Sequence, residues 1–451
     1  MTSRAPLAAA AISSLLLAAL PARAQATIHE HRFTLDAPAE VVAGVEAACA
    51  GCDWGVAGRE ARALRLELDG RYSQHLMLVR GPTVAPYHVS LGALGPGPHR
   101  LAIGEDAGWA SPHAGRASVA RVTIQAIPEG DPRHALFAHS PIVYARPNAV
   151  GRFTDVPLLT WVEQDRRPEG RRLRYSVIFS NEDGGTPAGR LLATWGRLTD
   201  IEYALGVELA ADGRALSAEY QGKDHKIVPF GGRREGGHAL LWDVTDNNML
   251  AEEGATSVRF APAPLAFDLS GTSREAVMDA EPWTYAVSSA EARREGRVKD
   301  GARPGEKEIL DPRRYLYLEA CAETRDVGLT FGVGVAGKGG VRFVDSDGGN
   351  GEFLIQRSPD HFPNGCFRAA VPLPQGARVE DLRALRFRAR TRPPGEGETP
   401  LPPGSGSARL LRVNKLFVLG NDDQPGPSFF TWTGELALVP EGPAMELRIG
   451  G

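Results

Sequence analysis

The residues best suited to chemistry lie in one short segment, from Gly196 to Glu202. Its sequence, Gly-Arg-Leu-Thr-Asp-Ile-Glu, places Asp200 and Glu202 two positions apart, where an apolar alternation begins. Alternation with a period of two predicts a β-strand, on which residues i and i+2 share a face. The apolar side chains would cover the other face, and they are Ile201, Tyr203, Leu205, Val207 and Leu209. The sequence therefore predicts two carboxylates side by side on the polar face of a strand.

Two carboxylates on one strand face can share a hard cation through their oxygen atoms. Asp243, Asn247 and Asn248 belong to the oxygen-rich stretches that could complete the shell. Because calcium and magnesium accept carboxylate, amide and carbonyl oxygens, Ca²⁺ or Mg²⁺ is expected rather than zinc. The predicted metal ligands are Asp200, Glu202, Asp224, His225 and Asp246. The structural alternative is that these charges lie on the wet face of an edge strand and that the Asp-Asn clusters form turns.

The same carboxylates suit a second chemistry, the acid-base hydrolysis of a glycan. The two carboxyl groups of a glycosidase lie roughly 5 to 10 Å apart across the scissile bond. Neighbours on one strand face are about 6.6 Å apart, given the rise of ~3.3 Å per residue. Asp200 and Glu202, or either of them with Asp246, would then act as acid and base. The sequence contains no Gly-x-Ser-x-Gly elbow, so a serine nucleophile is not predicted.

Aromatic side chains favour a function of another class, binding without catalysis. Trp161, Trp195, Trp242 and Trp283 all fall in the central part of the chain. Exposed indole rings can serve as stacking platforms for sugars, whereas packing in the core is the alternative for tryptophan in a β-sandwich. The predicted ligand-binding residues are Trp195, Trp242 and Asn247. Solvent exposure of the two rings distinguishes the two interpretations.

Composition indicates what kind of element carries these side chains. The 52 glycines and 34 prolines are spread along the chain, which favours short strands over long helices. Only the stretch from Ser289 to Gly296 is expected to be helical, with Gly296 ending it. The expected fold is mainly β, with three units in which β-sandwich modules flank a central β-sandwich-like domain.

The three predicted units follow an N-terminal segment, residues 1–26. Residues 27–126 are expected to form an immunoglobulin- or fibronectin-like sandwich, and Asp69-Gly70 in it is typical of a hairpin turn. Residues 127–300 form the central β domain and residues 301–451 the C-terminal sandwich. The Pro- and Gly-rich stretch 297–308 is expected to be a linker.

The central region also resembles a known family. A Pro141-Ile142-Val143-Tyr144 opening, an aromatic strand and a Gly196-x-x-x-Asp200-x-Glu202 segment occur in the same order. This order resembles the vacuolar protein sorting-associated family of the sixty-two type and, more remotely, the necrosis-inducing Nep-like proteins. The resemblance implies a β-sandwich and, in the necrosis-inducing branch, a divalent metal at an acidic pocket beneath a Gly-His-Arg-His-Asp-Trp-Glu heptapeptide. Here Arg197 and Thr199 replace the two histidines, so that branch's membrane-damaging activity is not carried over.

Export is predicted by the first 26 residues, which combine a positive start, an apolar run and a small-residue cleavage site. We therefore expect a secreted or periplasmic protein with no transmembrane segment after removal of this signal peptide. An oxidising environment favours two disulfides. The expected pairs are Cys49 with Cys52 and Cys321 with Cys366. Four cysteines allow three pairings, so the others stay open.

The charge balance limits the class of partner. The chain has 51 Lys and Arg against 55 Asp and Glu, so no overall field attracts nucleic acid. The expected partner is a glycan or another cell-surface ligand. The function predicted from the sequence is recognition at the cell envelope or outside the cell, with Ca²⁺ or Mg²⁺. The alternative is a metal-assisted or carboxylate-dependent hydrolase that acts on a glycan.

Overall fold

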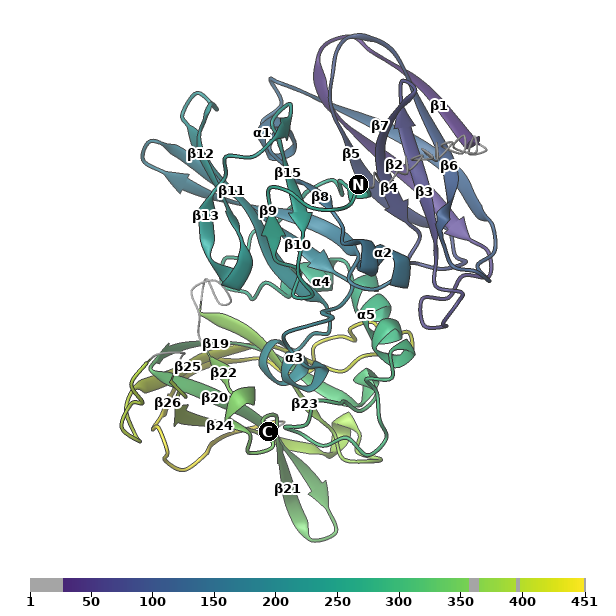
Figure 1. Cartoon of the computed structure of the whole chain (residues 1–451). Coiled ribbons are helices and arrows are strands. Elements are labelled where there is room, and N and C mark those ends of the chain that lie inside the picture. The colour runs from purple at the N-terminus through teal and green to yellow at the C-terminus, as the bar shows by residue number, and fades with distance from the viewer. Residues whose placement is uncertain (1–26, 357–364, 395–397, 450–451) are drawn as a thin grey trace, which may run out of the picture.

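The protein is mainly β, as predicted, and the strands of its described residues pair into six sheets. The computed structural model describes residues 27–356, 365–394 and 398–449. The predicted signal peptide, residues 1–26, lies outside the described residues. In the part of the chain that is described, no helix is long and apolar enough to cross a membrane. Figure 1 shows three β-rich bodies that follow one another along the chain from purple to yellow.

The N-terminal body is a sandwich of two antiparallel sheets, ordered β1-β6-β3-β4 and β5-β2-β7. Its strands are β1 (Thr27–Leu35), β2 (Ala39–Cys49), β3 (Arg62–Leu68), β4 (Arg71–Met77), β5 (Ala85–Leu94), β6 (Gly97–Ala110) and β7 (Ala117–Pro128). The inward-facing residues, such as Val41, Leu64 and Leu101, form its core. Asp69 and Gly70 join β3 to β4 with φ of 51° and 78°, as a tight hairpin with a primed turn requires.

The central body has one large sheet, β13-β12-β11-β10-β9-β18, and a smaller one, β14-β15-β8-β17, to which β16 is added. Its strands are β8 (Ile142–Tyr144), β9 (Pro157–Arg167), β10 (Gly170–Phe179), β11 (Asp200–Ala210), β12 (Ala215–Gln221), β13 (Ile227–Pro229), β14 (Arg234–Glu235), β15 (His238–Asp243), β16 (Leu250–Ala251), β17 (Arg259–Phe260) and β18 (Leu265–Ala266). The core between these sheets includes Val143, Tyr175 and Leu241.

The C-terminal body is a second sandwich, with sheets ordered β23-β19-β25-β26 and β21-β20-β24-β27, where β22 pairs with β20. Its strands are β19 (Tyr315–Arg325), β20 (Val327–Gly337), β21 (Gly340–Asp345), β22 (Ile355–Gln356), β23 (Cys366–Pro372), β24 (Leu382–Thr391), β25 (Ser407–Phe417), β26 (Trp432–Leu438) and β27 (Met445–Arg448). Leu318, Phe331 and Phe387 lie in the core between the sheets.

Both predicted disulfides are confirmed. Cys49 at the end of β2 is bonded to Cys52. Cys321 and Cys366 are direct register partners on β19 and β23 and are bonded across the sheet. The second bridge therefore joins neighbouring strands within the C-terminal sandwich.

The helices are more numerous than the single one predicted. Within the described residues they are α1 (His134–Ala138), α2 (Pro147–Arg152), α3 (Ala188–Trp195), α4 (Ala276–Ala280) and α5 (Trp283–Arg294). Helix α5 contains most of the predicted helical stretch, but it begins six residues before Ser289. Gly296, with φ of 70°, follows its end. The prediction missed the others because short helices between strands leave too few residues for a 3.6-residue period.

The predicted linker, residues 297–308, is a packed connection rather than a free one. Arg297 donates from Nη1 to the side-chain oxygen of Asn181 at 2.9 Å. The backbone oxygen of Lys307 accepts from the N–H of Gly189 in α3 at 2.9 Å. These contacts hold the stretch against the central body, beside the loop that follows β10.

Candidate functional site

Strand β11 does not separate polar from apolar side chains as the sequence predicts. It pairs residue by residue with β10 except at Ala204, which the register skips. Such a β-bulge exchanges the faces of all residues beyond it. Asp200 and Glu202 therefore share the interior face with Leu205 and Val207, and they are only 3% and 7% exposed. The predicted separation into a polar and an apolar face is wrong, and so is the structural alternative of a wet strand face, because both carboxyl groups point into the space between the two sheets.

A third carboxyl group, that of Glu182, interacts electrostatically with these two. We call Glu182, Asp200 and Glu202 the carboxyl cluster. The backbone N–H of Thr186 donates to Glu182 Oε1 at 2.6 Å. Asn248 donates from Nδ2 to Asp200 Oδ2 at 2.9 Å, and the side-chain amide of Gln221 donates to Glu202. β10 and β11 bring these groups together, because Glu182 follows the end of β10 where Asp200 begins β11.

Burial changes the acidity of all three groups. It raises the pKa of Glu182 to about 8, and the neighbouring Asp200 carboxylate adds to the rise. Burial and the same neighbour raise the pKa of Glu202 well above its usual range. Burial also raises the pKa of Asp200, against the opposing effect of the Arg197 guanidinium 3.8 Å away. Glu182 consequently keeps its proton at neutral pH.

Two buried arginines, Arg197 and Arg274, lie near the carboxyl cluster but do not form a separate ion pair with each of its carboxyl groups. Arg197 pairs through Nε with Glu275 Oε1 at 3.2 Å. Arg274 interacts with Glu202 and Asp200, and burial lowers its pKa. Its Nε and Nη2 atoms have no hydrogen-bond partner among the described residues. Protons on the carboxyl groups, rather than one-to-one ion pairs, therefore supply part of the charge balance.

Glu182 also lines a cavity of about 460 Å³. The lining comes from residues 182–188, 295–297, 307 and 308. Asp183 lies on the same wall, with its carboxylate 3.5 Å from the guanidinium of Arg297, 3.8 Å from that of Arg152 and 3.9 Å from that of Arg146. The wall thus presents a protonated carboxyl group beside a carboxylate held among cations.

The loop after β10 fits closely around Glu182. A Cβ on Gly185 would lie 2.7 Å from Glu182 Oε1 and 2.7 Å from Asn247 Oδ1, and the backbone there has a φ of 91°. Only glycine meets both conditions without displacing the carboxyl group or the amide. Glu182 is not among the site residues predicted from the sequence. The signal was a Glu-Asp pair directly after an apolar strand, followed by Gly-Gly.

The predicted metal ligands are not assembled into one shell. Asp224 is exposed and its nearest charged partner is Lys226, at 3.7 Å. Asp246 is bound to the guanidinium of Arg146. His225 is exposed and reaches the cluster only indirectly, since its Nδ1 lies 3.2 Å from the amide nitrogen of Gln221. Among the described residues, no group of three or more His, Cys, Asp or Glu side chains is placed to hold a metal ion.

The predicted sugar-stacking platform is also absent at Trp242. Its ring is 4% exposed and stacks on Tyr144 with 4.2 Å between ring centroids. Trp195 is half-buried and packs against the C-terminal core. Asn247, half-buried, lies with its amide nitrogen 3.1 Å from His225 Nε2. Of the three predicted ligand-binding residues, only Asn247 lies beside the carboxyl cluster, next to Gly185.

Comparisons with known proteins assign no family. No family model matches the chain, and no curated protein matches it. One solved structure that matches is described as "Structure of PNGF-II in C2 space group", at 11% identity and a TM-score of 0.16. The match covers 22% of this chain and spans about a quarter, 23%, of that one. A likeness of this size carries no argument about fold or function.

Proposed function

We propose that the protein is a carboxyl-dependent hydrolase in which Glu182 is the general acid. The observation that carries the proposal is the pKa of Glu182, raised to about 8, at the wall of the 460 Å³ cavity. A general acid works best when its pKa is near the working pH, because it is then protonated yet able to release the proton. Perturbed carboxyl groups in a cleft are also typical of active sites.

The nearby carboxyl groups have the other roles in the proposed reaction. Asp200 and Glu202 are the other members of the carboxyl cluster, and the charge of Asp200 helps to keep Glu182 protonated. Asp183, on the cavity wall, is the carboxylate that can orient and deprotonate a water molecule. A pair of carboxyl groups in different surroundings is the usual acid and base of such a reaction. The proposal uses no metal ion.

The cavity favours a hydroxyl-rich substrate, and we take a glycan as the substrate class. Its lining contains carboxylates, Thr186, Arg297 and Lys307, which can exchange hydrogen bonds with sugar hydroxyl groups. An apolar ligand would leave these groups without partners, at a cost in affinity. The two disulfides support a place of action at the cell envelope or outside the cell.

The proposal is tested by assaying a panel of neutral oligosaccharides for hydrolysis with the wild-type protein and Glu182→Gln. The variant keeps the shape and the hydrogen bond from Thr186 but has no proton to donate. It should lose activity by about 10²- to 10⁴-fold. Glu253→Gln, an exposed change in the central body, is the matched control and should keep full activity. Equal activity of Glu182→Gln and wild type would refute the proposal, and binding without turnover by the wild type would favour recognition alone.

A further inference from the structure

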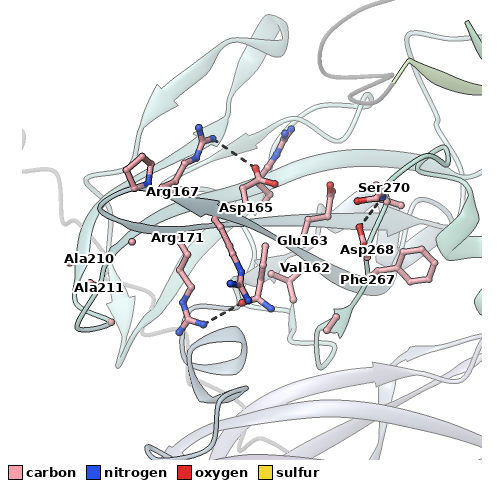
Figure 2. Close-up of a pocket in the computed structure, with 18 residues that line it drawn as sticks. Val162, Glu163, Asp165, Arg167, Arg171, Ala210, Ala211, Phe267, Asp268 and Ser270 are labelled. Atoms are coloured by element: carbon pink, nitrogen blue, oxygen red, sulfur yellow. Dashed lines mark hydrogen bonds and ion pairs between the residues drawn. The ribbon is translucent and has the colours of Figure 1, made fainter.

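A cavity of about 1200 Å³ opens beside the β9–β10 hairpin (Figure 2), but the side chains around it do not form one site. In the register of the two strands, Arg166 and Arg171 lie on one face of the hairpin, whereas Glu163 and Arg174 lie on the other. The interface between the N-terminal and central bodies contains a better defined arrangement, a buried pair of ionisable side chains.

Glu40 and His238 form this pair, where the start of β2 in the N-terminal sandwich meets the start of β15 in the central body. Glu40 Oε2 lies 3.2 Å from His238 Nε2, and the two residues are 2% and 3% exposed. The other ring nitrogen, Nδ1, lies 2.8 Å from the backbone oxygen of Ser140. β5 covers the pair at Gly92, where a Cβ would lie 3.7 Å from His238 Nε2. We call Glu40 and His238 the interface pair.

The geometry of the interface pair requires a proton between the two side chains. A backbone oxygen only accepts hydrogen bonds, so Nδ1 of His238 carries a hydrogen and donates it to Ser140. In a neutral imidazole Nε2 would then be an acceptor, and it would face the carboxylate of Glu40, which is also an acceptor. A proton between Nε2 and Oε2 turns this unfavourable contact into a hydrogen bond. The contact between the two bodies therefore depends on a proton that it can lose.

The carboxylates around His238 favour this proton. Burial opposes a charge on the imidazole ring, but the hydrogen bond to Glu40 and the charge of Glu40 outweigh it. Glu235, the register partner of His238 on β14, acts in the same direction. The pKa of His238 is consequently raised above its ordinary value of 6.5. The closed interface thus binds the proton more tightly than an exposed histidine does.

The basic side chains nearby do not take the place of this proton. Burial, the guanidinium of Arg234 and the neighbouring His238 lower the pKa of His139 to about 4, so His139 is neutral at neutral pH. Arg234 donates from Nη1 to the backbone oxygen of Gly237 at 2.9 Å. His134 in α1 acts on His139 in the same direction as Arg234 does. His238 is therefore the group that links the charge of this region to pH.

We propose that the proton of the interface pair holds the N-terminal sandwich against the central body, and that the interface loosens there when rising pH removes the proton. Without it, two buried acceptors face each other, and separating them so that water can enter relieves the contact. The proposal does not depend on hydrolysis at Glu182, because it concerns the contact between two bodies.

The direction of the pH dependence follows from linkage. When the interface is open, His238 has its ordinary pKa of 6.5, and when it is closed the pKa is higher. The stabilisation is fully present below pH 6.5, where both states are protonated, and it is lost as the pH rises through the higher pKa of the closed state. Between these two values opening becomes easier by up to about tenfold per pH unit.

Two backbone hydrogen bonds between the bodies report this opening. The N–H of Ser90 donates to the oxygen of Ala261 at 2.8 Å, and the N–H of Ala263 donates to the oxygen of His88 at 3.0 Å. Hydrogen–deuterium exchange of the full-length protein, read by mass spectrometry, measures the protection of both segments relative to the intrinsic exchange rate at each pH. In the wild type this protection should fall by about threefold or more between pH 6 and pH 9.

Glu40→Gln tests the role of the proton most directly. The new amide can donate to neutral His238 or accept from protonated His238, so the contact persists without depending on pH. Its protection should stay within about twofold between pH 6 and pH 9. His238→Gln, whose amide donates to Glu40 at every pH, should also remove the pH dependence and replaces the first variant if that one does not fold. His99→Gln removes a similar pair with Asp69 inside the N-terminal sandwich, so it is the matched control and should behave as the wild type does.

Glu182 also ionises in this pH range, so Glu182→Gln separates the two effects. It should show the wild-type loss of protection at the interface. Wild-type protection that does not change with pH would overturn the proposal. So would Glu40→Gln or His238→Gln proteins that lose protection as the wild type does, or a loss of the pH dependence in His99→Gln or Glu182→Gln.

Discussion

At the scale of single residues, the proposed chemistry depends on Glu182, which the sequence alone did not identify. The spacing of Asp200 and Glu202 correctly marked them as neighbours, because residues two apart on a strand share a face. Their burial and the approach of Glu182 depend on how β10 and β11 pair, which the local pattern does not contain. A charged group in a strand pattern does not reveal whether it faces solvent or a core.

Activity should depend on pH through the proton of Glu182. If Glu182 is the general acid, kcat/KM should fall on the alkaline side with an apparent pKa near 8. Asp200→Asn removes the negative charge that helps to raise this pKa, so the alkaline limb should move to lower pH. The pH profile of hydrolysis measures both effects. An alkaline limb that stays in place in Asp200→Asn would contradict the coupling between the two carboxyl groups.

Stability should depend on pH through the same group. Its pKa is about 8 in the folded protein and near the ordinary value of 4.5 in the unfolded chain. Below pH 4.5 both states are protonated and this contribution is fully present. Between 4.5 and 8 only the unfolded chain releases the proton, so the free energy of unfolding falls by about 1.4 kcal/mol per pH unit.

Urea denaturation between pH 5 and 8 checks this dependence. Glu182→Gln cannot ionise, so its free energy of unfolding should fall less steeply with pH than that of the wild type. Glu253→Gln changes an exposed carboxylate and should follow the wild-type curve. Parallel curves for wild type and Glu182→Gln would mean that Glu182 is already ionised at neutral pH in the folded protein.

At the scale of elements, the sequence predicted the strands better than their registers. The central part of β11 was recognised from its alternation, but the bulge at Ala204 was not. An alternation that continues through a bulge looks the same in sequence as one without it, because only the partner strand shows the extra residue. Helix α3 was missed for a related reason, since its packing against the C-terminal sandwich determines it more than its eight residues do.

A buried ion network joins β23 to α4 and β19. Arg368 is fully buried, and its Nη2 lies 2.7 Å from Asp279 Oδ2 and 2.5 Å from Glu319 Oε2. Arg368→Met would leave the buried carboxylate of Glu319 without its cation and Asp279 with Lys415 alone, and it should cost about 3 to 5 kcal/mol of unfolding free energy. Arg409→Gln breaks an exposed pair with Glu323 and should cost about 1 kcal/mol or less. Urea denaturation measures the loss of unfolding free energy in both variants. Similar losses would contradict the expectation that the buried ion pair contributes more to stability than the exposed one.

At the scale of the whole molecule, α5 lies where the three bodies meet (Figure 1). Trp54 of the N-terminal body donates from Nε1 to Glu291 Oε2 at 2.8 Å, and Thr154 donates to the other oxygen at 2.7 Å. On the next residues of the helix, Arg293 donates to Asp423 of the C-terminal body at 2.7 Å. The sequence predicted the mainly β class and both cysteine pairs. It could not predict these contacts, because their partners lie far apart in the chain.

Trp54→Phe tests this connection. The substitution keeps an aromatic ring but removes the indole donor to a buried oxygen of Glu291. The expected loss is about 1 to 3 kcal/mol of unfolding free energy. Trp432→Phe, which changes a half-buried tryptophan on β26, is the comparison and should cost less. Calorimetric unfolding measures both, and an unchanged Trp54→Phe protein would show that α5 does not hold the N-terminal body.

Whether Glu182 is an acid at neutral pH can be measured by titrating this residue itself, followed by ¹³C NMR of protein labelled at the glutamate carboxyl carbon. Comparison with Glu182→Gln assigns the signal. We expect a resonance that remains in its protonated position at pH 7 and changes with a midpoint near pH 8. A Glu182 signal that titrates near its ordinary value of 4.5 would contradict the role of Glu182 as the general acid, because the residue would then be ionised at neutral pH.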